Sequence, residues 1–306
     1  MQTDTTSPQT SPSPPGRADV DETPRPASGA LTKTGGFLRG YTHTLQPYIG
    51  CRFGCAYCYV AGLSVHHFHQ PTLDWGAYAH PRTGIAARLA KELTRLAARG
   101  LLATTSIFMS SATDPYQPLE RHWRLSRACL DAFIAQPPGR LVLQTRSPLV
   151  EDDFDRLRQL GDRLWLSITL ETDRDDVRRA VAPRCPSVAR RMALIRRARA
   201  AGLQVQVAVS PCLPFSGVAT FGQLLLNLET RVVVDTYTSG DGQAGKRTAR
   251  TTIPAAYRAQ GWGDWRAEDA ARELYTWLHE RIGARAGWSQ AGFAALAAPA
   301  TERSDA

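Results

Sequence analysis

Cys51-Arg52-Phe53-Gly54-Cys55-Ala56-Tyr57-Cys58 brings three cysteines together within eight residues, directly after a short β-type run. Cysteines at positions i, i+4 and i+7 of one compact loop allow three thiolates to bind one metal centre. Three thiolates complete three corners of a cubane [4Fe-4S] cluster and leave the fourth iron open for another ligand. The pattern therefore predicts an iron–sulfur site with Cys51, Cys55 and Cys58 as its ligands.

A structural zinc site is the alternative for the same loop. A histidine of the segment that follows, His66, His67 or His69, would then supply a fourth ligand. The chain would be a basic, zinc-containing nucleic-acid-binding module without redox chemistry. Zinc sites more often pair their cysteines as C-x2-C, so the spacing favours the cluster.

Short β-type runs alternate with helical patterns along the rest of the chain. The β-type runs are 41–48, 107–110, 141–145, 164–169, 205–210 and 232–237, and the helical patterns are 83–98, 119–135, 153–160, 187–200 and 221–228. A strand that alternates with a helix predicts parallel strands joined by right-handed crossovers. We therefore expect an α/β fold, a partial (β/α)6 barrel of the TIM type, with its active site at the carboxyl ends of the strands.

The domain organisation follows from composition. Residues 1–34 are rich in Pro, Ser and Thr and have no apolar periodicity, which predicts a disordered N-terminal tail. Residues 35–306 are expected to form one catalytic domain, with a core at about 41–240 and a helical extension at about 264–295. With 306 residues, 43% of them hydrophobic, the chain is long enough to bury one large core.

Charge and hydropathy limit the partners. A net charge of +9 and a pI near 9.6 favour anionic partners such as nucleic acid. No apolar run approaches the roughly 18 to 20 residues that span a bilayer, so no membrane partner is expected. No apolar signal segment lies near Met1, and clustered cysteines are typical of a reducing compartment, which together predict a cytoplasmic protein. The oligomeric state is not indicated.

The C-x3-C-x-aromatic-C spacing, with Tyr57 before the last cysteine, resembles the signature of the radical S-adenosylmethionine (radical SAM) enzymes. The resemblance implies SAM and a [4Fe-4S] cluster as cofactors. It implies reductive cleavage of SAM to a 5′-deoxyadenosyl radical, which abstracts hydrogen from a substrate. A flavodoxin- or ferredoxin-like protein is the implied electron donor. Nucleic acid is one expected substrate, and a peptide or a small metabolite is the alternative.

From about Leu45 to Pro214 the chain is similar to bacterial proteins of the spore photoproduct lyase-like group. Residues 111–120 match a T-D-P-Y-Q-P-x-E element of that group, which implies that Thr113 and Asp114 face SAM. Residues 144–148 resemble its T-K-S element, whose lysine neutralises the SAM carboxylate. Arg146 stands in place of that lysine and is expected to take its role.

Two further cofactor contacts are implied by the resemblance. Ser167 lies in a strand-like run whose serine approaches the cofactor in relatives. Arg184 belongs to a segment, 181–187, that resembles an E-P-R-x-P-S element and is expected to bind a cofactor or substrate anion. Ala182 replaces the usual glutamate of that element, so a role that needs its carboxylate is in doubt.

One departure bears on the reaction. Spore photoproduct lyase is thought to use a cysteine of the strand-end loop to return a hydrogen atom to its product. Here the loop has Ala112 before Thr113-Asp114 and carries no thiol. The sequence therefore predicts that the chain is not itself a spore photoproduct lyase. Cys212, near the end of the fifth β-type run, is the alternative thiol for the same cavity.

The remaining features receive structural interpretations. Cys129 and Cys185 are isolated in the sequence and are predicted to be structural thiols. The glycine-rich, basic loop 239–247 lacks a phosphate-binding signature and is predicted to be a flexible surface loop. The helix at 187–200 is predicted to be a solvated outer helix; its arginines are Arg190, Arg191, Arg196, Arg197 and Arg199.

Overall fold

The computed structural model describes residues 20–64, 66 and 74–300. Its largest element is an eight-stranded sheet with the strand order β11-β10-β9-β8-β7-β6-β3-β2. The strands are β2 (Leu31–Lys33), β3 (His43–Leu45), β6 (Ser106–Met109), β7 (Arg140–Thr145), β8 (Leu164–Thr169), β9 (Val205–Val209), β10 (Arg231–Val234) and β11 (Ala286–Trp288). Neighbouring strands from β3 to β11 pair in parallel, and β2 pairs antiparallel with β3.

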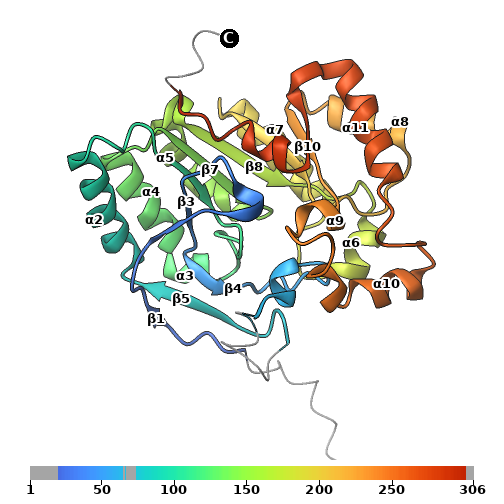
Figure 1. The fold of residues 1–306 in the computed structure, drawn as a ribbon, viewed down its shortest axis with the longest axis horizontal. Helices are drawn as coiled ribbons and strands as arrows, with labels where there is room; N and C mark the ends of the chain where they lie inside the picture. The colour runs from blue at the N-terminus through green and yellow to red at the C-terminus, as the bar shows by residue number, and fades with distance from the viewer. Residues whose placement is uncertain (1–19, 65, 67–73, 301–306) are drawn as a thin grey trace, which may run out of the picture.

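Helices connect the parallel strands (Figure 1). The larger ones are α2 (Ile85–Ala98), α4 (Leu125–Ala135), α5 (Phe154–Gln159), α7 (Val188–Ala200), α8 (Val218–Leu226) and α11 (Asp269–Ile282). The shorter ones are α3 (Glu120–Trp123), α6 (Asp175–Val181), α9 (Tyr237–Gly240), α10 (Ile253–Gln260) and α12 (Ser289–Ala294). Six parallel strands, β3 and β6 to β10, follow one another in chain order, which confirms the predicted α/β fold. Among the described strands, β2 and β11 stay at opposite edges, so the barrel is open.

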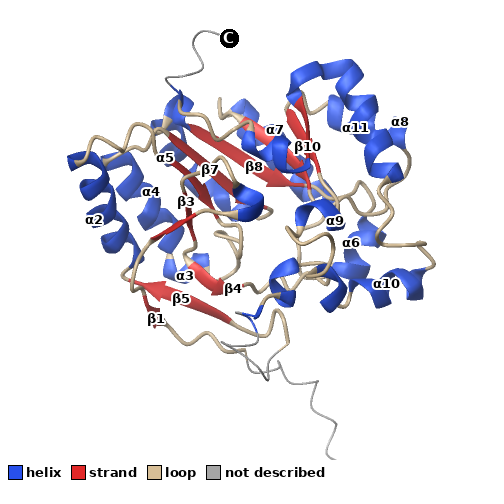
Figure 2. Cartoon of the chain, viewed as in Figure 1, coloured by secondary structure: helices blue, strands red, loops and turns tan. Residues whose placement is uncertain are grey.

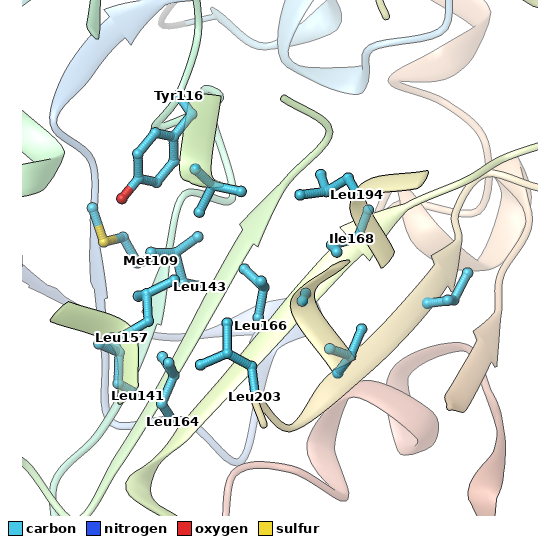
Figure 3. Packing of buried hydrophobic residues seen from close by; sticks show 14 of the residues in the cluster. Met109, Tyr116, Leu141, Leu143, Leu157, Leu164, Leu166, Ile168, Leu194 and Leu203 are labelled. Carbon is cyan, nitrogen blue, oxygen red and sulfur yellow. The ribbon is translucent and has the colours of Figure 1, made fainter. Parts of the chain in front are cut away.

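The two faces of the sheet bury different sets of side chains, as the two-residue period of a strand requires. On the outer face, leucines of β7 and β8 pack against Leu157 of α5 and Leu194 of α7 (Figure 3). Val142 lies between two of those leucines in the sequence and belongs to the cluster on the inner face. The outer layer of helices thus leaves the inner face free for other segments.

The C-terminal segment fills part of that inner face. Phe293 of α12 packs in a T-shaped contact against Phe108 of β6, and the Tyr41 hydroxyl donates to the Phe293 carbonyl at 2.8 Å. The segment also adds β11 to the sheet beside β10. The predicted extension at about 264–295 therefore contains a strand as well as helices, and it contributes to the core.

A small second sheet has the order β1-β5-β4, formed by β1 (Arg25–Pro26), β5 (Ala79–Thr83) and β4 (Tyr48–Gly50) (Figure 2). Strands β1 and β2 lie inside the predicted tail, so the described residues 20–34 belong to the fold and the boundary at residue 34 is wrong. Residues 1–19 lie outside the described part. Backbone amides of Ala30 and Leu31 donate to the Glu92 carboxylate at 2.9 and 2.8 Å. Such tertiary contacts order a segment that has no periodicity of its own.

The predicted helix at 119–135 is two helices. The chain turns at Arg124, which has a left-handed backbone with φ of 47° between α3 and α4. The Glu120 carboxylate accepts from the backbone amide of Arg127 at 3.1 Å and so caps the start of α4. A composition of helix formers did not reveal this break. Within the described residues, no helix has the length and apolar character needed to cross a membrane.

Candidate active site

A cavity of about 530 Å³ opens at the carboxyl ends of the parallel strands, as the barrel interpretation predicts. Ser110 directly follows β6, Thr145 ends β7, and Ser210 and Asp235 directly follow β9 and β10. All four residues line the cavity. The loop between β4 and the short helix at Tyr59–Gly62 supplies the opposite part of the lining.

The cysteine loop places Cys51, Cys55 and Cys58 in the lining of this one cavity. Its turns are closed by backbone bonds from Gly54 to the Cys51 carbonyl at 3.2 Å and from Cys58 to the Cys55 carbonyl at 3.1 Å. Gly54 has φ of 56°, and a β-carbon there would lie 3.1 Å from the α-carbon of Gly76, so glycine is strongly favoured. The loop therefore has a defined backbone shape, and all three of its cysteines contribute to the lining of one cavity.

The loop of the T-D-P-Y-Q-P-x-E element supports the cysteine loop. The Thr113 hydroxyl donates to the Gly50 carbonyl at 2.5 Å, and the Gln117 side chain accepts from the backbone amide of Arg52 at 2.8 Å. Buried Asp114 accepts from the Thr145 hydroxyl at 2.7 Å. Its other oxygen accepts from the backbone amide of Arg146 at 3.0 Å. Burial raises the pKa of the Asp114 carboxyl above its ordinary value.

The Arg146 guanidinium lies beside Cys55. Its Nη1 atom is 3.1 Å from the Cys55 sulfur, 2.7 Å from the Tyr57 hydroxyl and 2.9 Å from Oε1 of Glu171. The other carboxylate oxygen of Glu171 pairs with Arg191, which also donates to the Thr169 carbonyl at 3.0 Å. Burial acts to raise the pKa of Glu171, but the guanidiniums of Arg191 and Arg146 lower it to about 2. The carboxylate is therefore charged.

A polar region of the cavity lining is not satisfied by the protein. Ser110 is buried with φ of 76°, a backbone conformation that non-glycine residues rarely adopt, and its hydroxyl has no partner among the described residues. Asp235 accepts from the Ser210 hydroxyl at 3.0 Å through Oδ2, and its Oδ1 has no partner among the described residues. Burial raises the pKa of Asp235 to about 6.

Comparison with known families assigns the chain. A sequence model of the Radical SAM superfamily matches residues 45–224, which contain the cysteine loop and most of the barrel. The chain belongs to the radical SAM superfamily. It is an enzyme, and its family implies SAM and an iron–sulfur cluster as cofactors.

Individual relatives add to this assignment. An uncharacterized protein of Mycobacterium tuberculosis is 28% identical over 176 residues, 57% of this chain and 50% of the relative. An uncharacterized protein of the Acidianus two-tailed virus is 31% identical over 172 residues, 54% of either chain. The chain spans about half the length of these curated relatives.

Solved structures of spore photoproduct lyase share the fold. The complex of that lyase with dinucleoside spore photoproduct aligns over 86% of this chain and 79% of the lyase, with a TM-score of 0.59 and 14% identity. A lyase variant with AdoMet and the same dinucleoside bound aligns over 87% and 81%, with a TM-score of 0.57 and 16% identity. The resemblance to a radical SAM enzyme of this group is thus confirmed at the level of the fold.

The charges of this radical SAM chain fit an anionic group beside Cys55. The guanidinium of Arg146 lies next to the Cys55 sulfur, at 3.1 Å from Nη1. Its acidic neighbours are Glu171, at 2.9 Å, and the buried Asp114, whose carboxyl lies 3.9 Å from Nε. A guanidinium donates strong hydrogen bonds to anionic groups, so thiolate ligands of a cluster, or a carboxylate held in the cavity, would meet a charged donor here. The residues present therefore fit both cofactors that the family implies.

The predicted cofactor contacts fall into two groups. Thr113, Asp114 and Arg146 line the cavity, whereas Ser167 and Arg184 are not part of its lining. The fully buried Ser167 hydroxyl donates to Gln144 at 3.1 Å, and Gln144 does line the cavity. Exposed Arg184 donates to the Gly76 carbonyl at 2.8 Å, beside the turn at Gly54. Ser167 thus contacts a residue of the lining, and Arg184 contacts the backbone beside the cysteine loop.

Three features differ from the sequence interpretation. Arg191 was expected on a solvated helix but is fully buried, because it shares the face of α7 that carries Val188, Leu194 and Ile195. Cys185 is not isolated, since its sulfur lies 3.4 Å from that of Cys55. Neither Arg191 nor Glu171 was predicted as a site residue. The available signals were the helical spacing of Arg191 and the position of Glu171 just after β8.

The loop 239–247 is also more ordered than predicted. Buried Asp241 accepts from the backbone amides of Gln243 and Gly245 through one oxygen and of Arg247 and Thr248 through the other. The four distances lie between 2.7 and 3.1 Å. The loop is therefore folded around one carboxylate, and Asp241 and Arg247 line the cavity.

The zinc alternative gains no support in the described part of the chain. His66 is buried, and its Nδ1 lies 2.8 Å from the Tyr78 hydroxyl, with the two rings stacked. His67 and His69 lie outside the described residues. Over residues 20–64, 66 and 74–300, no three side chains of His, Cys, Asp or Glu come together as ligands of a single ion. Cluster ligands have to be spread around a larger group, as the cavity allows.

Proposed function

We propose that this enzyme cleaves SAM reductively at a [4Fe-4S] cluster held by Cys51, Cys55 and Cys58. When bound, the cluster and SAM together supply a 5′-deoxyadenosyl radical that abstracts hydrogen from a substrate. The observation that carries the proposal is that three cysteines and the guanidinium of Arg146 line one cavity of about 530 Å³. A redox-inactive binding module has no need of that combination.

The roles proposed for the other residues follow from their contacts. Arg146 lines the cavity and carries a positive charge beside Cys55, so its proposed role is to bind the SAM carboxylate. Thr113 fixes the cysteine loop through Gly50, and Asp114 fixes Arg146 through its backbone amide. Ser167 and Arg184 act as positioning residues, the first through Gln144 and the second through Gly76.

The substrate is proposed to occupy the polar part of the cavity, away from the cysteines. Ser110, Ser210 and Asp235 line this part of the cavity, so a substrate there would lie beside polar side chains. Lys33 and Arg247 also line the cavity, and the net charge is +9, which favours a substrate that carries phosphate, such as nucleic acid. A peptide or metabolite substrate is the alternative.

The function is tested with anaerobically reconstituted protein. Iron and sulfide are counted, and 5′-deoxyadenosine is quantified after addition of dithionite and SAM. Deuterated oligonucleotides, peptides or metabolites are then offered separately, and deuterium is sought in the 5′-deoxyadenosine. A colourless zinc protein, or an iron protein that leaves SAM intact, would contradict the proposal. If deuterium reaches 5′-deoxyadenosine from the peptide and from no other candidate, the substrate is a peptide and not nucleic acid.

Arg146→Ala is expected to weaken SAM binding by about 1.5 to 3 kcal/mol, or roughly 10- to 150-fold, because a carboxylate loses its charged donor. The substitution leaves Glu171 paired with Arg191, so the fold and the iron content are expected to persist. Equilibrium dialysis with SAM measures the effect. Arg190→Ala, on the exposed face of α7, is the matched control. Equal SAM affinity in both variants would remove Arg146 from the site.

Spore photoproduct lyase activity is expected to be absent. Among the described residues that line the cavity, Cys51, Cys55 and Cys58 are the only thiols, and Cys212 and Ala112 provide no hydrogen donor there. The reduced enzyme is incubated with SAM and dinucleoside spore photoproduct, with the lyase itself as positive control, and thymine is quantified against 5′-deoxyadenosine. Efficient repair by this chain would refute the expectation.

A further inference from the structure

The structure brings a fourth cysteine to the cysteine loop. Cys185 lies between α6 and α7, 130 residues from Cys55 in the sequence, and the two sulfur atoms are 3.4 Å apart. Cys185 is buried and is not part of the cavity lining, whereas Cys55 is. The Cys185 thiol therefore contacts Cys55 from the side that faces away from the cavity.

The position of Cys185 is fixed by the backbone around it. Its amide donates to the Ala182 carbonyl at 3.0 Å, and its carbonyl accepts from the Arg178 guanidinium at 3.0 Å. Arg178 is itself held by Asp175, whose carboxylate lies 2.8 Å from Nε. The following helix begins with the Ser187 hydroxyl as its cap. Cys185 is thus a rigidly placed neighbour of Cys55 rather than a flexible one.

Resting on the proposed function, we propose that Cys185 donates its S–H to the Cys55 sulfur and thereby raises the reduction potential of the cluster. A ligating Cys55 is a thiolate and has no proton, so Cys185 has to be the donor of the pair. Arg146 supplies a second donor to the same sulfur at 3.1 Å. Both donors to the Cys55 sulfur are side chains, whereas the sulfurs of Cys51 and Cys58 accept from backbone amides.

The direction of the effect follows from the charge that reduction adds. The extra electron makes the thiolate ligands more negative, so a hydrogen bond to a ligand sulfur is stronger in the reduced state. The same hydrogen bond stabilises the oxidised state less. Removing the Cys185 donor therefore makes the cluster harder to reduce. Because Cys185 acts through Cys55, it is a positioning residue and not a ligand.

The test is an anaerobic redox titration of the reconstituted protein, followed by the EPR signal of the reduced cluster. Cys185→Ala is expected to lower the midpoint potential, with a tenfold loss in the reduction equilibrium corresponding to about 59 mV. Cys185→Val fills the space without a donor and is expected to show the same fall if the alanine variant assembles too little cluster. Cys185→Ser keeps a donor and is expected to restore the wild-type value. Cys129→Ala, at a buried thiol elsewhere, is the control.

The outcomes separate this inference from the proposed function. If the wild-type protein binds no cluster, the proposed function fails. If the cluster forms and the alanine and valine variants keep the wild-type potential, only the role of Cys185 is overturned. An equal fall in Cys185→Ser would also overturn it, because packing and not donation would then set the potential.

Discussion

Cys51→Ala and Cys58→Ala are each expected to lose the iron–sulfur cluster and with it all SAM cleavage above background. The three cysteines supply all the thiol ligands in the lining of the cavity as described, so each loss leaves one iron without a protein ligand. Iron and sulfide analysis, the visible absorption of the cluster and the yield of 5′-deoxyadenosine measure the effect. Cys129→Ala, a buried thiol away from the cavity, is expected to behave as wild type.

Cys55→Ala is the stricter test of the ligand assignment, because the thiol of Cys185 lies next to Cys55. Cys185 is held behind the cavity wall by Ala182 and Arg178, and we expect it not to replace the missing ligand. The double variant Cys55→Ala/Cys185→Ala tests this point. If the single variant binds a cluster and the double variant does not, Cys185 replaces Cys55 as the third ligand. Full iron content and SAM cleavage in both would contradict the assignment of Cys55.

The order of strands and helices was predictable because each repeats a pattern over many residues. Buried strands such as 164–169 and amphipathic helices such as 85–98 carry that pattern in their own sequence. The strands β1 and β2 did not, because two or three residues are too few to show a period. Their order depends on partners far away, as the bonds from Ala30 and Leu31 to Glu92 illustrate.

For the site, too, local features were predictable from the sequence and long-range contacts were not. The spacing of Cys51, Cys55 and Cys58 is local, so the sequence alone predicts that they line one site. The contact between Cys55 and Cys185 joins residues 130 positions apart and has no local signal. Arg191 was misread because a charged residue on a helix is normally solvated. Its spacing from Val188 and Leu194 places it on the buried face, where a carboxylate has to accompany it.

Glu171→Gln is expected to destabilise the protein by roughly 3 to 5 kcal/mol, because it leaves the buried guanidinium of Arg191 without its counter-charge and removes one of the two acidic neighbours of Arg146. Arg191 is the more affected, since its Nε and Nη2 atoms have no partner among the described residues. The glutamine keeps the shape of the side chain, so packing is nearly unchanged. The free energy of unfolding is measured with urea on protein free of cluster, where no thiolate-bound iron compensates the charge.

Glu151→Gln provides a matched control, because its partner Arg197 lies on the same helix as Arg191. Glu151 pairs with Arg197 of α7 at 2.6 Å, but the Arg197 side chain is 53% exposed, so water screens the pair. Its loss is expected to change the free energy of unfolding by about 1 kcal/mol or less. Combining Glu171→Gln with Arg191→Met is expected to recover part of the stability, because the double variant removes the positive charge of Arg191 together with the negative charge of Glu171. If Glu171→Gln cost no more than Glu151→Gln, the ion pairs of Glu171 would not be stabilising the wall behind Cys55.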